Sequence, residues 1–208
     1  IVSGWLALVL LVGPVASMCV PNREALLAAV DDFSTNGAAA ASVMTYGSIT
    51  DWCFTGITNL SYVFSPVRNA STAGVTSMKG MFKDASAFNE NLASWDMSAV
   101  TDVSEMFRNS VSFNQPLAAW DVSSVQDMSS MFSSANSFNQ PLSSWDTSSV
   151  TTMLSMFTSA TSFNQPLGEW NVSSVTNFGS MFSRAVVFNQ SLSSWDVSSS
   201  TVFGSMFR

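Results

Sequence analysis

The chain repeats itself every 25 residues over most of its length. Tryptophan recurs at this interval from Trp95 to Trp195, and phenylalanine does so from Phe88 to Phe188. A fixed period of about 20 to 50 residues is typical of proteins in which each unit buries its apolar face only against its neighbours. We therefore expect a stack of similar coils, with one coil for each repeat.

The repeat, "SSVTxMxSMFxSAxSFNQPLxxWDxS", changes its apolar spacing partway. Helical spacing predicts a short helix over residues 125–135. Pro141 then interrupts the helical pattern, and a short strand is expected around Leu142 and Trp145, with both side chains inward. The predicted fold class is an α/β repeat: a right-handed solenoid with one short strand and one short helix per 25-residue coil, and with its strands in a parallel sheet.

The region before the repeats predicts a leader and a cap. Residues 1–18 carry no charge and include an apolar run, which predicts a signal peptide, with a signal anchor as the alternative. Residues 19–46 contain "PNREALLAAVDDF", which predicts an N-terminal capping helix followed by a linker. The solenoid is expected over 47–208.

The solenoid is expected to be irregular at its start. Coils over 47–82 are degenerate, because the unit between Phe64 and Phe82 lacks the FNQP loop, whereas coils over 83–208 are regular. The chain begins with Ile and stops one residue after a Met-Phe pair, without a polar closing unit. We expect the sequence to be truncated, with further repeats in the parent or a partner on the last coil.

Composition argues against several functions. Charged residues make up 10% of the chain and the net charge is −7, so no basic surface for nucleic acid is expected. Histidine is absent, which removes the usual general base and the commonest metal ligand. We predict no enzyme, no catalytic residue, no metal site and no cofactor.

Three side-chain columns are predicted to be structural. The tryptophans should lie in the core, and the asparagines should satisfy backbone groups between coils. The aspartates favour turns in which the carboxylate accepts backbone N–H bonds, with a calcium ladder as the alternative. These columns are Trp95, Trp120, Trp145, Trp170 and Trp195; Asn114, Asn139 and Asn164; and Asp96, Asp121, Asp146 and Asp196.

Other residues suggest a binding face and covalent modifications. Small residues between Leu and Trp should leave a flat outer face for a glycan or a protein, with a merely solvated surface as the alternative. Cys19 and Cys53 predict one disulfide, or else two separate thiols. Asn69 is the predicted glycan acceptor among four NxS sequons. The candidate binding face comprises Ser94, Ser143, Ser144, Glu169, Ser193 and Ser194.

The string "VTxMxxMF…FNQPLxxWDxSxVT" resembles the repeats of the BspA-like leucine-rich-repeat surface proteins, over roughly residues 23–208. The resemblance implies a leucine-rich-repeat-like solenoid at the cell surface or secreted, with adhesion or binding to an extracellular protein or glycan. It implies no catalytic residue. Membrane association is expected only if the leader is retained as an anchor. The alternative function is a wall or coat component that self-associates end to end.

Overall fold

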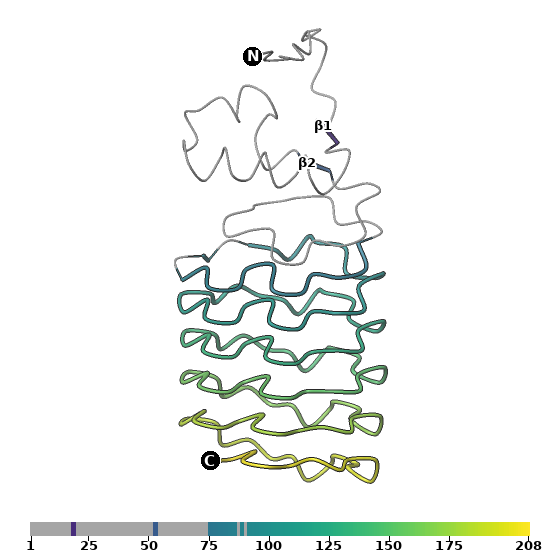
Figure 1. Cartoon of the computed structure of the whole chain (residues 1–208), viewed down its shortest axis with the longest axis vertical. Coiled ribbons are helices and arrows are strands. Elements are labelled where there is room, and N and C mark those ends of the chain that lie inside the picture. Colours follow the sequence, from purple (N-terminus) through teal and green to yellow (C-terminus); the bar gives the residue numbers. More distant parts are fainter. Residues whose placement is uncertain (1–17, 20–51, 54–74, 87, 90) are drawn as a thin grey trace, which may run out of the picture.

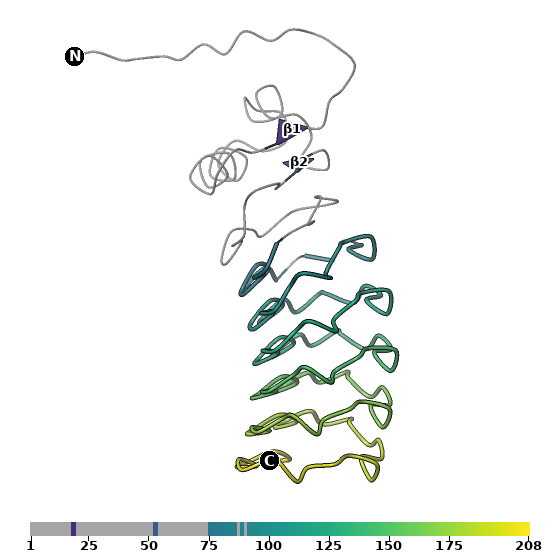
Figure 2. The same cartoon turned by 90° about the vertical axis from the view of Figure 1, so that its right-hand side faces the viewer.

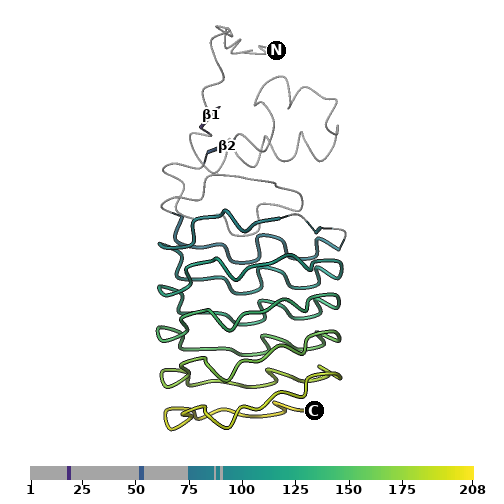
Figure 3. The ribbon, with the colours of Figure 1, turned by 180° about the vertical axis from the view of Figure 1, so that it is seen from behind.

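In the computed structural model, the described residues are 18–19, 52–53, 75–86, 88–89 and 91–208. From residue 75 onward the chain winds into successive coils stacked along one axis (Figure 1). The side view shows each coil as a thin layer over the next (Figure 2), and the view from behind shows the same order (Figure 3). Two strands lie earlier in the chain, β1 (Met18–Cys19) and β2 (Trp52–Cys53), and they pair in parallel.

Backbone hydrogen bonds join each coil to the next at a constant offset. The N–H of Met78 donates to the carbonyl of Asp102 at 2.9 Å, and the N–H of Val103 donates to the carbonyl of Asp127 at 3.0 Å. Each coil contributes one residue to a column of isolated parallel bridges. These residues are Ser77, Asp102, Asp127, Thr152, Asn177 and Val202.

The apolar columns of the repeat fill the interior of the stack. Leu142 and Met131 are fully buried, and Trp145 is 3% exposed. Two of the buried polar side chains bond across coils: Thr147 Oγ1 donates to the carbonyl of Asn171 at 2.9 Å, and Ser110 Oγ donates to that of Phe82. The buried hydroxyl of Ser104 has no partner among the described residues. Burial therefore follows the 25-residue period.

Aromatic rings stack along the axis in register with the coils. Phe132 lies 5.6 Å from Phe107 and 5.6 Å from Phe157 between ring centroids, with interplanar angles of 6° and 8°. Within one coil, Phe132 lies 4.0 Å from Phe138. Stacked aromatic pairs contribute about 0.5–1.5 kcal/mol each beyond the area they bury. The repeated phenylalanines therefore stabilise the contact between coils as well as each coil.

The structure has consecutive turns where the sequence predicts a helix over 125–135. The N–H groups of Ser130, Phe132 and Ser134 donate to the next coil, to the carbonyls of residues 154, 156 and 158, so they are not available to a helix. Ser130 and Ser134 also have φ of 57°, which no right-handed helix contains. The turns close through bonds between residues three apart, such as Met131 N–H to Met128 carbonyl. That spacing mimics the helical pattern in the sequence.

The strand expected around Leu142 and Trp145 is likewise a turn. The N–H of Trp145 donates to the carbonyl of Leu142 at 3.1 Å, so two residues reverse the chain between two inward side chains. Parallel pairing lies instead at Asp127, two residues after Val125. Among the described residues only β1 and β2 are strands and none is helical. The handedness of the coils stays a prediction.

The predictions for the beginning of the chain lie largely outside the described residues. These are the leader at 1–18, the capping helix at 19–46 and most of the degenerate coils at 47–82. In the part of the chain that the structure describes, no helix is long and apolar enough to cross a membrane.

Candidate functional site

The predicted binding face lies at tight turns between Leu and Trp rather than on a strand. All six of its residues are exposed. Two of the hydroxyls contribute to stacking: Ser144 Oγ donates to the carbonyl of Ala118 at 2.9 Å, and Ser194 Oγ donates to that of Gly168 at 2.6 Å. These bonds place equivalent turns of successive coils side by side. The Leu–Trp turns, residues 93–94, 118–119, 143–144, 168–169 and 193–194, thus form one edge of the stack.

The tryptophan column is buried from Trp95 to Trp170 and partly buried at Trp195, and it is hydrogen-bonded across coils. Trp120 Nε1 donates to the carbonyl of Leu92 at 2.9 Å, and Trp145 Nε1 donates to that of Leu117 at 3.0 Å. Trp170 and Trp195 repeat the bond. Within the described part, the buried Nε1 of Trp95 has no acceptor. The four buried tryptophans therefore present no outward surface to a sugar ring.

The asparagine column forms a ladder in which glutamines also take part. Asn114 Oδ1 accepts from the N–H of Asn139 at 3.0 Å and from Gln140 Nε2 at 2.9 Å, and the next coil repeats both bonds. Our sequence reasoning missed the glutamines, although the recurring "FNQ" is the signal that marks them. Both side chains serve the contact between coils, which leaves this column little capacity for a ligand.

The aspartate column caps turns. Asp96 Oδ1 accepts from both the N–H and the hydroxyl of Ser98, at 3.0 and 2.6 Å. The hydroxyl of Ser98, and then its N–H, lowers the pKa of Asp96, and Ser148 does the same for Asp146. No group of three or more acidic or cysteine side chains in the described ranges could hold a metal ion. The hydrogen bonds to the following turn are those expected of turn-capping aspartates, and a calcium ladder would not require them.

A second, half-buried edge carries left-handed backbone at two positions per coil. We define the variable edge by the repeat positions of Glu105, Arg108 and Asn109. Glu105 and Asn109 have φ of 58° and 60°, and their equivalents in later coils have similar values. The N–H groups at both positions donate to the next coil. The backbone is thus fixed here while the side chains are free to differ.

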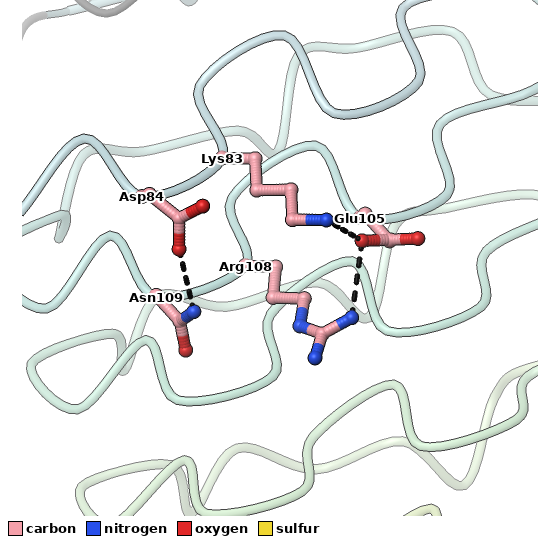
Figure 4. A network of polar contacts seen from close by, with 5 residues as sticks. All are labelled: Lys83, Asp84, Glu105, Arg108 and Asn109. Atoms are coloured by element: carbon pink, nitrogen blue, oxygen red, sulfur yellow. Dashed lines mark hydrogen bonds and ion pairs between the residues drawn. The ribbon is translucent and has the colours of Figure 1, made fainter. Parts of the chain in front are cut away.

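In the first coils the variable edge is charged and internally paired. Glu105 accepts from Lys83 Nζ at 2.6 Å and from Arg108 at 3.1 Å, and Asn109 Nδ2 donates to Asp84 at 2.6 Å (Figure 4). The hydrogen bond from Lys83 is the main cause of the lowered pKa of Glu105, and the charge of Arg108 contributes. Few of these charges are left for an outside partner.

In the later coils the same edge becomes a hollow of about 320 Å³, which we call the hydroxyl hollow. No aspartate or glutamate side chain is among its lining residues, and within the described residues neither of its arginines forms an ion pair with such a side chain. Nothing in our sequence reasoning identified it, because its residues come from the same positions of successive repeats and are brought together only when the coils stack. The lining residues are Ser155, Thr158, Ser159, Ser180, Ser183, Arg184, Ser205 and Arg208.

The predicted disulfide and glycan acceptor stay predictions. The register of β1 and β2 makes Cys19 and Cys53 Cα partners in adjacent parallel strands. Adjacent strands lie about 4.8 Å apart, which is within the Cα separation that a disulfide tolerates. Asn69 lies outside the described residues.

Comparison with known proteins identifies one family. Its model, described as "Mycoplasma protein of unknown function, DUF285", matches residues 33–141 and again 115–208. No curated protein and no solved structure matches the chain. The two matches overlap and together extend through all the repeats, so the chain belongs to the DUF285 family.

Proposed function

We propose that this chain is a non-catalytic cell-surface or secreted repeat protein that binds an extracellular glycan or protein. The resemblance of its repeats to BspA-like surface proteins supports the location, and the absence of histidine argues against common catalytic mechanisms. A long stack of coils offers a repeated surface of the kind that solenoid proteins use for binding.

The observation that carries the proposal is the hydroxyl hollow. Ser155, Ser159 and Ser180 line it with hydroxyls that make no hydrogen bond to any described residue, and Arg184 and Arg208 add two positive charges. Hydroxyls donate and accept, whereas guanidinium groups bind carboxylate or sulfate. The lining suits a polyhydroxylated ligand that carries an acidic group, such as an anionic glycan.

The binding test compares the two edges. We expect Arg184→Ala combined with Ser159→Ala to weaken binding to immobilised sulfated and carboxylated glycans at least tenfold. The matched control, Ser94→Ala with Ser143→Ala, alters the Leu–Trp turns without adding charge and should leave that binding unchanged. The reverse pattern would assign binding to the Leu–Trp turns, and no binding to any glycan in the panel would contradict the glycan proposal.

The location is tested separately on intact cells. A membrane-impermeant biotin reagent should label the full-length parent protein at the surface, or the protein should be recovered from the medium. Protection in intact cells, with labelling only after lysis, would contradict the extracellular assignment.

End-to-end self-association is the second candidate, and exposed apolar side chains in the final coil favour it. Phe207 is 65% exposed, Phe203 42% and Val202 43%. Sedimentation velocity over a range of concentrations measures this directly. A sedimenting mass that rises with concentration would support assembly, provided that the double variant Phe203→Ser with Phe207→Ser stays monomeric over the same range. A monomer at all concentrations would exclude it for this chain.

A further inference from the structure

One coil differs from the others in the aspartate column, because Asn171 replaces the aspartate found at residues 96, 121, 146 and 196. The replacement creates the sequence Asn171-Val172-Ser173, which is an N-glycosylation sequon. Asn171 is exposed, whereas Val172 is 1% exposed and anchors the turn. The column therefore presents one amide among four carboxylates.

The local turn at Asn171 brings the sequon serine against this amide. Its Oδ1 accepts from the hydroxyl of Ser173 at 2.8 Å and from the N–H of Ser173 at 3.2 Å. Nδ2 makes no hydrogen bond in the described structure. The sequon hydroxyl thus contacts the acceptor amide while the nitrogen faces solvent. We propose that Asn171 is an N-glycosylation site of this protein.

The reaction would join a sugar to the free nitrogen. Nδ2 of Asn171 attacks the anomeric carbon of a lipid-linked oligosaccharide, which the secretory pathway supplies together with its membrane-bound transferase. A C–N bond forms, the bond from that carbon to the phosphate oxygen breaks, Nδ2 loses one proton and the lipid diphosphate leaves. Because the folded turn exposes Asn171, a glycan added to the nascent chain is compatible with the coil.

Asn189 has a sequon too, but its surroundings differ. Ser191 Oγ lies 3.0 Å from Ser193 Oγ and makes no bond to Asn189. The backbone of Asn189 is held by the asparagine ladder, through Asn164 Oδ1 at 2.9 Å. The geometry therefore favours Asn171 within the described residues.

This inference rests on the proposed secretion, so its test supplies the secretory route. The 208-residue chain is expressed in glycosylating eukaryotic cells behind a heterologous signal peptide, and the secreted protein is treated with peptide N-glycosidase in H₂¹⁸O. Peptide mass spectrometry should find labelled aspartate at 171. The Asn171→Asp variant, which keeps the turn acceptor found in four other coils, should lose this mark and one glycan.

A secreted protein with no glycan at Asn171 would overturn the inference without affecting the proposed location, because the biotin experiment tests the location in the native cells.

Because the coils repeat, the glycosylation site can also be moved to another coil. Asp121 Oδ1 accepts from the N–H and hydroxyl of Ser123 at 3.1 and 2.6 Å, in the geometry of Asn171. Asp121→Asn in the Asn171→Asp background creates Asn-Val-Ser two coils earlier. The glycan should reappear at residue 121, and its absence there would contradict the role of the turn.

Discussion

The variable edge carries different chemistry in the first and the later coils. Around Glu105 it holds polar side chains that pair with one another: Lys83 and Arg108 form ion pairs with Glu105, and Asn109 donates to Asp84. In the later coils the same repeat positions hold serine and threonine, followed by two arginines without a carboxylate partner in the described residues. In the first coils the polar side chains of the edge pair with one another, whereas in the later coils they are available to a ligand.

The backbone beneath the two regions is the same. The N–H of Asp84 donates to the carbonyl of Arg108 at 2.8 Å, and the N–H of Ser159 donates to that of Ser183 at 2.7 Å. The φ angles, 62° at Asp84 and 57° at Ser159, also agree. The comparison teaches that the buried columns and the bonds between coils determine the coil, whereas the positions of the edge are free to take on binding functions.

The largest effect is expected from breaking a buried column. Phe132→Ala removes a fully buried ring stacked between Phe107 and Phe157, so the free energy of unfolding should fall by about 3–5 kcal/mol. Urea denaturation followed by fluorescence measures the change. Phe207→Ala, at the same repeat position but with a ring 65% exposed, is the control and should cost clearly less.

Breaking the asparagine ladder should have an intermediate effect. Asn139→Ala removes the Oδ1 that accepts from the N–H of Asn164 and from Gln165 Nε2, and we expect a loss of about 1–3 kcal/mol. On the variable edge, Asn109→Ala removes only an exposed bond to Asp84 and should cost under about 1 kcal/mol. Equal losses in urea denaturation would remove the distinction between ladder and edge.

The left-handed positions sharpen the comparison further. Ser130→Val places a β-branched side chain at φ 57°, and we expect a loss of about 1–2 kcal/mol. Ser130→Gly should be neutral or slightly stabilising in thermal unfolding, since Gly80 occupies the equivalent position with φ 61°. A valine variant as stable as the glycine variant would show that backbone geometry does not constrain this edge.

The smallest expected effect is on the stability of the fold at low pH. The pKa of Asp146 is lowered by the hydroxyl and the N–H of Ser148, so the ionised form stabilises the fold. This contribution is present above the unfolded pKa of about 3.9 and is lost as pH falls through the lower folded value. We expect the Tm of Asp146→Asn, which mimics Asn171, to fall less between pH 6 and pH 2.5 than the Tm of the wild type falls. An equal fall in the two proteins would contradict a role for Asp146.

Sequence reasoning identified the period and the inward columns, because both follow directly from recurring Trp, Phe, Leu and Met. It predicted a helix over 125–135 because turns closed between residues three apart, such as Met128 to Met131, produce helical spacing. The residue type of Ser130 gives no indication of its left-handed φ. The hydroxyl hollow was likewise not predictable, because its lining comes from residues 155–208 and is assembled only by stacking.

Deletion of one whole coil tests the central claim most directly. Removing residues 125–149 joins Ser124 to Val150, so every later residue keeps its repeat position. We predict that this variant unfolds cooperatively, with a smaller urea m-value because one coil less is exposed. Removing only residues 126–149 shifts all later columns by one position, and this variant should not fold. Two variants of equal stability would contradict a fold set by 25-residue columns.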